Sequence, residues 1–120
     1  MSKILVVDDE RSIRFSFEIF LSDAGYEVQS ATDGDKAIRI QREWQADLVI
    51  TDIVMPEEDG LGLIRALRKE FPQTRIIAIS GALFESDCHL KAAELLGAAQ
   101  VLLKPITKDQ LLQVVAENLA

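Results

Sequence analysis

The stretch LVITDIVMPEEDG, residues Leu48 to Gly60, places an aspartate just after an aliphatic run and follows it with a turn. The run Leu48-Val49-Ile50 is solidly apolar, which is typical of a short strand buried on both faces of a parallel sheet. Asp52 comes after Thr51, and the Met55-Pro56 turn lies just beyond. A carboxylate in this place is either a turn residue that ends the strand or a reactive group held at the edge of the sheet.

Four other segments extend this pattern along the chain. Residues 4–7, 76–79 and 101–103 are solid aliphatic runs, whereas residues 26–31 alternate between apolar and polar side chains. The solid runs predict central, buried strands, and the alternating segment predicts a strand with one wetter face at an edge of the sheet.

Helical periodicity follows each predicted strand. The apolar spacing predicts helices over 13–24, 37–44, 61–71, from 83 or 84 to 96, and 111–119. Gly25, Pro72 and Gly97 are stop signals, and Thr107 is the predicted N-cap of the last helix. Strand–helix alternation repeated in this way predicts an α/β fold with right-handed crossovers and helices on both faces of a parallel sheet.

Length and composition set further limits. The 120 residues suit a single domain over 1–120, and no linker, repeat or low-complexity segment is visible. The formal net charge of −7 disfavours direct binding to nucleic acid or to an anionic membrane. The single cysteine, Cys88, fits a reducing, cytoplasmic location. No apolar run approaches the roughly 20 residues of a membrane span, and no signal-peptide pattern is present at Met1.

Polar side chains follow four of the predicted strands at the point where each strand ends. These residues are Asp8 and Asp9, Asp52, Ser80, and Lys104. Each of them alone has an ordinary structural explanation as a helix cap, a turn residue or a strand exit. Because the carboxyl ends of parallel strands meet at one edge, where such folds bind ligands, we expect the five side chains to form one site.

The residue types in this set indicate a metal and a phosphoryl group. Two carboxylates about 5 Å apart repel by on the order of 3 kcal/mol at an effective dielectric constant of about 20, so a positive charge must offset them. Oxygen ligands without histidine or cysteine favour Mg²⁺. With Asp8 and Asp9 serving the metal, Asp52 is the predicted nucleophile, and Ser80 and Lys104 are predicted to hold phosphoryl oxygens.

Four motifs together, VVDDE, ITDIVMPEEDG, AISGA and LLKP, resemble the receiver domain of two-component response regulators, the chemotaxis regulator among them. The similarity covers essentially the whole chain. It implies a flavodoxin-like, doubly wound three-layer sandwich with a five-stranded parallel sheet of order 2-1-3-4-5 and five helices. It also implies a phosphoacceptor switch that catalyses only its own phosphorylation and dephosphorylation.

The resemblance further implies a role for each site residue. Asp52 would accept a phosphoryl group from the histidine of a partner protein. Asp9, Asp52 and the backbone carbonyl of Val54 would bind Mg²⁺, and Asp8 would act mainly through a metal-bound water. Ser80 would move to bind the phosphoryl group, and Lys104 would pair with that group. The peptide bond between Lys104 and Pro105 would be cis.

The sequence departs from the family pattern at three positions. Val101 stands where the family usually has tyrosine or phenylalanine, so a switch would run through the loop after Ser80 and the fourth helix. Val54 and Ala82 are apolar at positions that are often polar and help to admit water. We hypothesise that they slow loss of the phosphoryl group; an unchanged phosphoryl half-life in Val54→Asn would contradict this.

The implied partners are a sensor histidine kinase or a histidine phosphotransfer protein, and a downstream target or an output domain outside this chain. The implied state is a monomer or a phosphorylation-dependent dimer. Three other functions remain open: an aspartyl-phosphate phosphatase, a flavodoxin-type cofactor binder, and a scaffold that never receives phosphate. The phosphatase lacks its usual second acid at Val54, and Asp8-Asp9 would repel a flavin phosphate.

Overall fold

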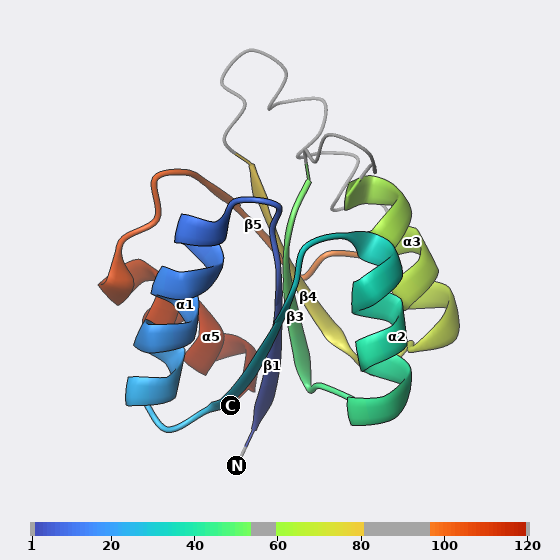
Figure 1. Ribbon diagram of the computed structural model, residues 1–120, viewed down its shortest axis with the longest axis horizontal. Helices are drawn as coiled ribbons and strands as arrows, with labels where there is room; N and C mark the ends of the chain where they lie inside the picture. The colour runs from blue at the N-terminus through green and yellow to red at the C-terminus, as the bar shows by residue number, and fades with distance from the viewer. Residues whose placement is uncertain (1, 54–59, 81–96, 120) are drawn as a thin grey trace.

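The computed structural model describes residues 2–53, 60–80 and 97–119, and all structural statements refer to these ranges. They form one parallel five-stranded sheet with helices on both faces (Figure 1). In chain order the elements are β1 (Lys3–Val7), α1 (Arg11–Asp23), β2 (Glu27–Ala31), α2 (Gly34–Trp44), β3 (Leu48–Asp52), α3 (Gly60–Glu70), β4 (Arg75–Ser80), β5 (Gln100–Leu103) and α5 (Lys108–Leu119). The helix predicted over 83–96 lies outside the described residues.

The strand order is β2-β1-β3-β4-β5, as the family resemblance implied, and every neighbouring pair is parallel. The alternating strand β2 lies at one edge, which confirms that prediction. The order reverses direction at β1, because the chain moves first to β2 and then across to β3. The loops after β1 and β3 therefore meet beside the carboxyl ends of the strands, where a doubly wound fold binds ligands.

The solid aliphatic runs are explained by two separate cores. In β1, Ile4 and Val6 belong to the core on one face of the sheet, and Leu5 and Val7 belong to the core on the other face. Successive side chains of a strand point to opposite faces, so a strand covered on both faces must be apolar at every position.

The helices divide between the two faces. Phe17 of α1 and Leu111 of α5 pack in the core that contains Ile4, and α1 and α5 lie together on that side of the sheet (Figure 1). Ala37 of α2 and Leu67 of α3 pack in the core that contains Leu5, on the opposite side. This pairing of helices leaves the carboxyl edge of the sheet to loops.

The helix boundaries follow mostly local rules. Gly25, just after α1, has a φ of 98°, which confirms the stop signal. Thr107 caps α5 by accepting a hydrogen bond from the Gln110 amide at 3.1 Å, as predicted. The second helix begins earlier than predicted, because the Asp33 carboxylate accepts from the Lys36 amide at 2.9 Å and so starts α2 at Gly34. This bond also lowers the pKa of Asp33.

Gly97 packs closely against the side chain of Arg68 from α3. Arg68 donates to the carbonyl oxygens of Pro72 at 2.8 Å, Thr74 at 3.0 Å and Gly97 itself at 2.9 Å. Gly97 has a φ of 118°, and a Cβ atom built on it would lie 2.7 Å from Arg68 Nε. Both the backbone conformation and the space therefore require glycine here.

We expect Gly97→Ala to lower the free energy of unfolding by about 2–4 kcal/mol, because it adds a steric clash to the cost of a positive φ. Gly25→Ala is the matched control: its φ is also positive, but its Cβ would meet nothing within 4 Å. We expect this control to lose only about 1–2 kcal/mol in urea denaturation. Equal losses in the two variants would contradict the proposed clash.

Candidate functional site

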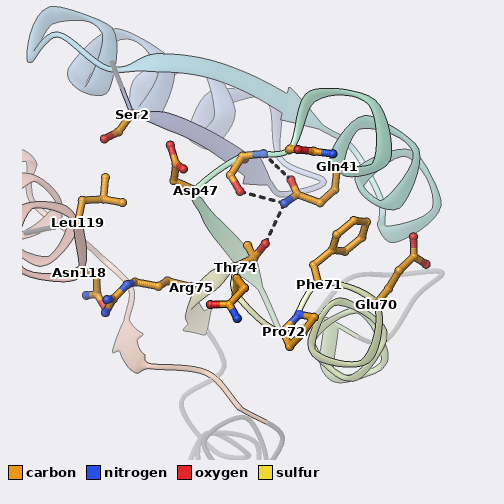
Figure 2. Close-up of a pocket in the computed structure, with 13 residues that line it drawn as sticks. Ser2, Gln41, Asp47, Glu70, Phe71, Pro72, Thr74, Arg75, Asn118 and Leu119 are labelled. Carbon is orange, nitrogen blue, oxygen red and sulfur yellow. Dashed lines mark hydrogen bonds between the residues drawn. The ribbon is translucent and has the colours of Figure 1, made fainter.

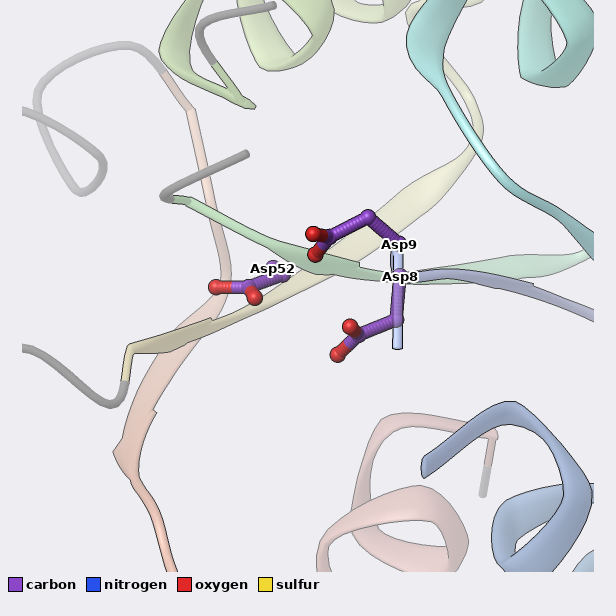
Figure 3. Close-up of side chains that lie close together, drawn as sticks. All are labelled: Asp8, Asp9 and Asp52. Atoms are coloured by element: carbon purple, nitrogen blue, oxygen red, sulfur yellow. The ribbon is translucent and has the colours of Figure 1, made fainter. Parts of the chain in front are cut away.

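Three aspartates meet at the carboxyl edge of the sheet. Asp8 and Asp9 follow β1, and Asp52 is the last residue of β3. One carboxylate oxygen from each lies within 4.8 Å of the others, and Figure 3 shows the Asp8 and Asp9 side chains reaching toward Asp52. The structure therefore brings together the three carboxylates that the sequence placed at one edge. Asp8 and Asp52 are buried, whereas Asp9 is exposed.

Lys104 lies between two of these carboxylates. Its Nζ is 3.1 Å from Asp8 Oδ2 and 3.1 Å from Asp52 Oδ2, and only 16% of its side chain is exposed. Glu10, which the sequence analysis did not assign to the site, lies 4.0 Å from the same Nζ and is itself 58% exposed. The sequence feature that could have indicated Glu10 is its position directly after the Asp8-Asp9 pair.

The carboxylates of Asp8 and Asp9 do not leave equal room for a ligand. Asp8 Oδ1 accepts from the Glu10 amide at 2.9 Å, while its Oδ2 faces Lys104. Both oxygens of Asp8 are thus engaged. No hydrogen bond or ion pair is formed by the carboxylate of Asp9 with any residue that the structure describes. Asp9 is therefore the carboxylate most open to a new ligand.

The pKa values reflect this crowding. Burial raises the pKa of Asp8, and the nearby Asp52 charge raises it further, against the opposing effects of the Glu10 amide and Lys104. Burial by itself would lower the pKa of Lys104, but the charges of Asp8 and Asp52 outweigh it, so its pKa is raised. The lysine is thus firmly protonated, and its ammonium group stabilises the two buried carboxylates.

The set of donors fits a hard divalent cation. Three carboxylates at −1 each and one ammonium at +1 leave a formal charge of −2 at the site. The available ligand atoms are all oxygens, which suits Mg²⁺ or Ca²⁺ better than zinc. A cation with two positive charges would offset the remaining repulsion.

The other predicted site residues occupy different positions relative to this cluster. Ser80 is fully buried at the carboxyl end of β4, next to β5, which leads into Lys104. The Lys104-Pro105 peptide bond is cis, as the resemblance implied. Val101 is half-buried and packs against the core under α2 and α3. Val54 and Ala82 lie outside the described residues.

A separate cavity lies at the opposite edge of the sheet (Figure 2). Its volume is about 600 Å³, and residues that precede strands, such as Ser2, Asp47 and Thr74, line it. Gln41 bonds across it to the Ala46 carbonyl oxygen at 2.9 Å and to Thr74 Oγ1 at 3.0 Å. These contacts hold the turn between α2 and β3, so the cavity has a structural explanation away from the acidic cluster.

Across the described ranges, none of the helices is both long and apolar enough to cross a bilayer.

Fold and site together define a class: doubly wound α/β domains with an acidic cluster and a lysine at the carboxyl edge of the sheet. The family profile of the response regulator receiver domain matches residues 4–116. The chain therefore belongs to the response regulator receiver domain family. This is the family that the four sequence motifs indicated.

Similar proteins agree with this membership. The chain is 41% identical to the probable transcriptional regulator ycf27 of Porphyridium aerugineum, over 91% of this chain and 44% of that protein. It is 40% identical to the DNA-binding transcriptional regulator NtrC of Azospirillum brasilense, over 97% of this chain and 24% of that protein. The receiver domain of NtrX from Brucella abortus has a TM-score of 0.90 and 34% identity, with 97% of each chain covered. The chain thus spans less than half the length of these two curated relatives.

Proposed function

We propose that residues 1–120 act as one receiver domain that accepts a phosphoryl group on Asp52 with the help of Mg²⁺. The donor would be the phosphorylated histidine of a sensor kinase or a histidine phosphotransfer protein. The observation that carries this proposal is the joint placement of Asp52, two further aspartates and Lys104 at one edge of the sheet. Otherwise the carboxyl ends of three strands would have to bring these four side chains together by coincidence.

The contacts of the three aspartates support different roles toward the metal. Asp9 has an open carboxylate and would bind Mg²⁺ directly, together with Asp52 and the Val54 carbonyl oxygen. Asp8 has both carboxylate oxygens engaged by Glu10 and Lys104, so it would act mainly through a metal-bound water. When bound, Mg²⁺ would offset negative charge on the attacking and transferred oxygens.

In the transfer step, a carboxylate oxygen of Asp52 attacks phosphorus and forms an acyl phosphate. The phosphorus–nitrogen bond of the donor phosphohistidine breaks, and its electron pair returns to the imidazole. The Lys104 ammonium, already 3.1 Å from Asp52 Oδ2, would pair with the transferred group. The Ser80 hydroxyl, at the end of the neighbouring strand, would hold another phosphoryl oxygen.

The output of this reaction would be a changed binding surface and not a released product. The phosphoryl group shifts the domain toward an active conformer only as far as it binds that conformer better. The domain would catalyse its own phosphorylation and dephosphorylation and no other reaction. Two relatives are named as transcriptional regulators and exceed this chain in length, so we propose that the target is a separate protein or an output domain of a longer regulator.

Intact mass spectrometry after incubation with acetyl phosphate tests the proposal. We expect the protein to gain one phosphoryl group in the presence of Mg²⁺ and none when the metal is chelated. Rapid hydrolysis of many donor molecules without a retained adduct would instead support a phosphatase. A protein that gains no adduct from acetyl phosphate or from any histidine kinase would be a scaffold.

Mg²⁺ should also stabilise the folded protein, because it binds the native cluster and not the unfolded chain. At a concentration about 100 times the dissociation constant, we expect a gain of about 2.7 kcal/mol in the free energy of unfolding. Asp9→Asn should remove most of this gain. Asp23→Asn, an exposed aspartate at the end of α1, is the control and should keep it. Loss of the Mg²⁺ effect in both variants would contradict the assigned site.

A further inference from the structure

Every backbone and side-chain polar group of Asp8 has a partner. Its amide donates to the Ala31 carbonyl oxygen at 3.2 Å, and its two carboxylate oxygens face Glu10 and Lys104. Its own carbonyl oxygen accepts a hydrogen bond from Arg14 Nη1 at 2.7 Å, which is the shortest of these contacts. The loop between β1 and α1 is therefore held at Asp8 from four sides.

Arg14 reaches this carbonyl oxygen from the first turn of α1. Its amide bonds to the Glu10 carbonyl oxygen at 3.2 Å, which fixes the start of the helix, and its side chain turns back toward the end of β1. The N-cap residue, Glu10, makes no side-chain capping bond. The hydrogen bond from the Arg14 guanidinium therefore links α1 to the loop before it, in a place where the N-cap side chain forms no such bond.

The bonded carbonyl oxygen belongs to the peptide unit that joins Asp8 to Asp9. This unit is planar, so fixing the direction of its oxygen also fixes the plane that contains the Asp9 amide and Cα. That plane sets the N–Cα bond about which the Asp9 side chain is placed, so it limits the positions that the Asp9 carboxylate can reach. Arg14 thus helps to position the backbone that carries the open carboxylate, although it forms no ion pair with a carboxylate of the cluster among the residues that the structure describes.

We propose that Arg14 is a positioning residue for the metal site: it holds the Asp8–Asp9 peptide so that the Asp9 carboxylate faces Asp52. This inference rests on the proposed function, because it assumes that the cluster takes a divalent cation. Groups that orient metal ligands typically change metal affinity by about 10–100-fold when they are removed. We therefore expect Arg14→Met to weaken Mg²⁺ binding by about 10-fold.

Arg11→Met is the matched control. Arg11 is exposed, begins the same helix turn and forms no hydrogen bond or ion pair with Asp8, so its replacement removes one positive charge without removing a bond to that residue. Arg14→Lys keeps the charge and a donor but loses the planar guanidinium, and we expect an affinity between those of Arg14→Met and the wild type.

The experiment titrates Mg²⁺ against thermal unfolding for the wild type and the three variants, and then measures phosphoryl incorporation from acetyl phosphate at saturating Mg²⁺. We expect Arg14→Met to need about 10-fold more Mg²⁺ than the wild type, Arg14→Lys an intermediate amount and Arg11→Met the wild-type amount. Each variant should reach the wild-type adduct once it is saturated with Mg²⁺. Equal affinities of Arg14→Met and Arg11→Met would overturn the positioning role while leaving the proposed function standing.

Two further outcomes are decisive. If Arg14→Met does not fold, Arg14→Lys carries the test: an affinity below that of the wild type supports the proposal, and an unchanged affinity overturns it. A wild-type protein that shows neither stabilisation by Mg²⁺ nor a phosphoryl adduct overturns the proposed function and the role of Arg14 together.

Discussion

Replacing Asp52 by asparagine should abolish phosphoryl incorporation while leaving the fold intact. The asparagine side chain has nearly the same size, so it fits the buried position that Asp52 occupies at the end of β3. Its neutral amide cannot attack phosphorus as the carboxylate does. The change also removes one of three crowded negative charges, which should keep or raise the stability of the metal-free protein.

Intact mass after treatment with acetyl phosphate and Mg²⁺ measures this effect directly. Asp23→Asn, which removes the same charge from an exposed position, should be phosphorylated like the wild type. An adduct on Asp52→Asn at the wild-type level would show that another residue accepts the phosphoryl group.

Replacing Lys104 by methionine should lower the free energy of unfolding by about 3 kcal/mol in the absence of metal. The side chains of Asp8 and Asp52 are only 3% and 6% exposed, and the Lys104 ammonium is their shared counter-charge. Without it, two buried carboxylates face each other with water largely excluded. Methionine keeps most of the length of the side chain, so the loss reports the charge more than the packing.

Mg²⁺ should recover part of this loss, because the cation supplies positive charge at the same place. The gain from Mg²⁺ should therefore be larger in Lys104→Met than in the wild type. Lys69→Met, an exposed position in α3, is the control and should change stability by less than about 0.5 kcal/mol. Urea denaturation with and without Mg²⁺ measures all of these values, and equal losses in the two variants would contradict the role of Lys104.

The strands were predictable because they depend on the pattern of apolar side chains, and their order was implied by the family resemblance. A solid run such as Ile4-Leu5-Val6-Val7 can only be buried on both faces, and the structure divides these residues between two cores. Because parallel strands bring their carboxyl ends to one edge, where such folds bind ligands, the sequence also predicted that Asp8, Asp9, Asp52 and Lys104 lie close together.

The side-chain contacts that hold loops and turns in place were less predictable. Gln41, Arg68 and Arg14 each use a side chain to bond backbone carbonyl groups of other segments. No regular spacing in the sequence indicates such bonds, because the geometry of the folded loops determines which carbonyl group each side chain meets. Glu10 shows the same limit: its proximity to Lys104, 94 positions along the chain, depends on the tertiary fold.

Chemical mapping of the phosphorylated residue tests the central claim most directly. Borohydride reduction of an aspartyl phosphate leaves homoserine, which peptide mass spectrometry locates in the sequence. After treatment with acetyl phosphate and Mg²⁺, we expect homoserine at position 52 and none at positions 8 or 9. Homoserine at another aspartate, or an adduct that resists reduction, would contradict it.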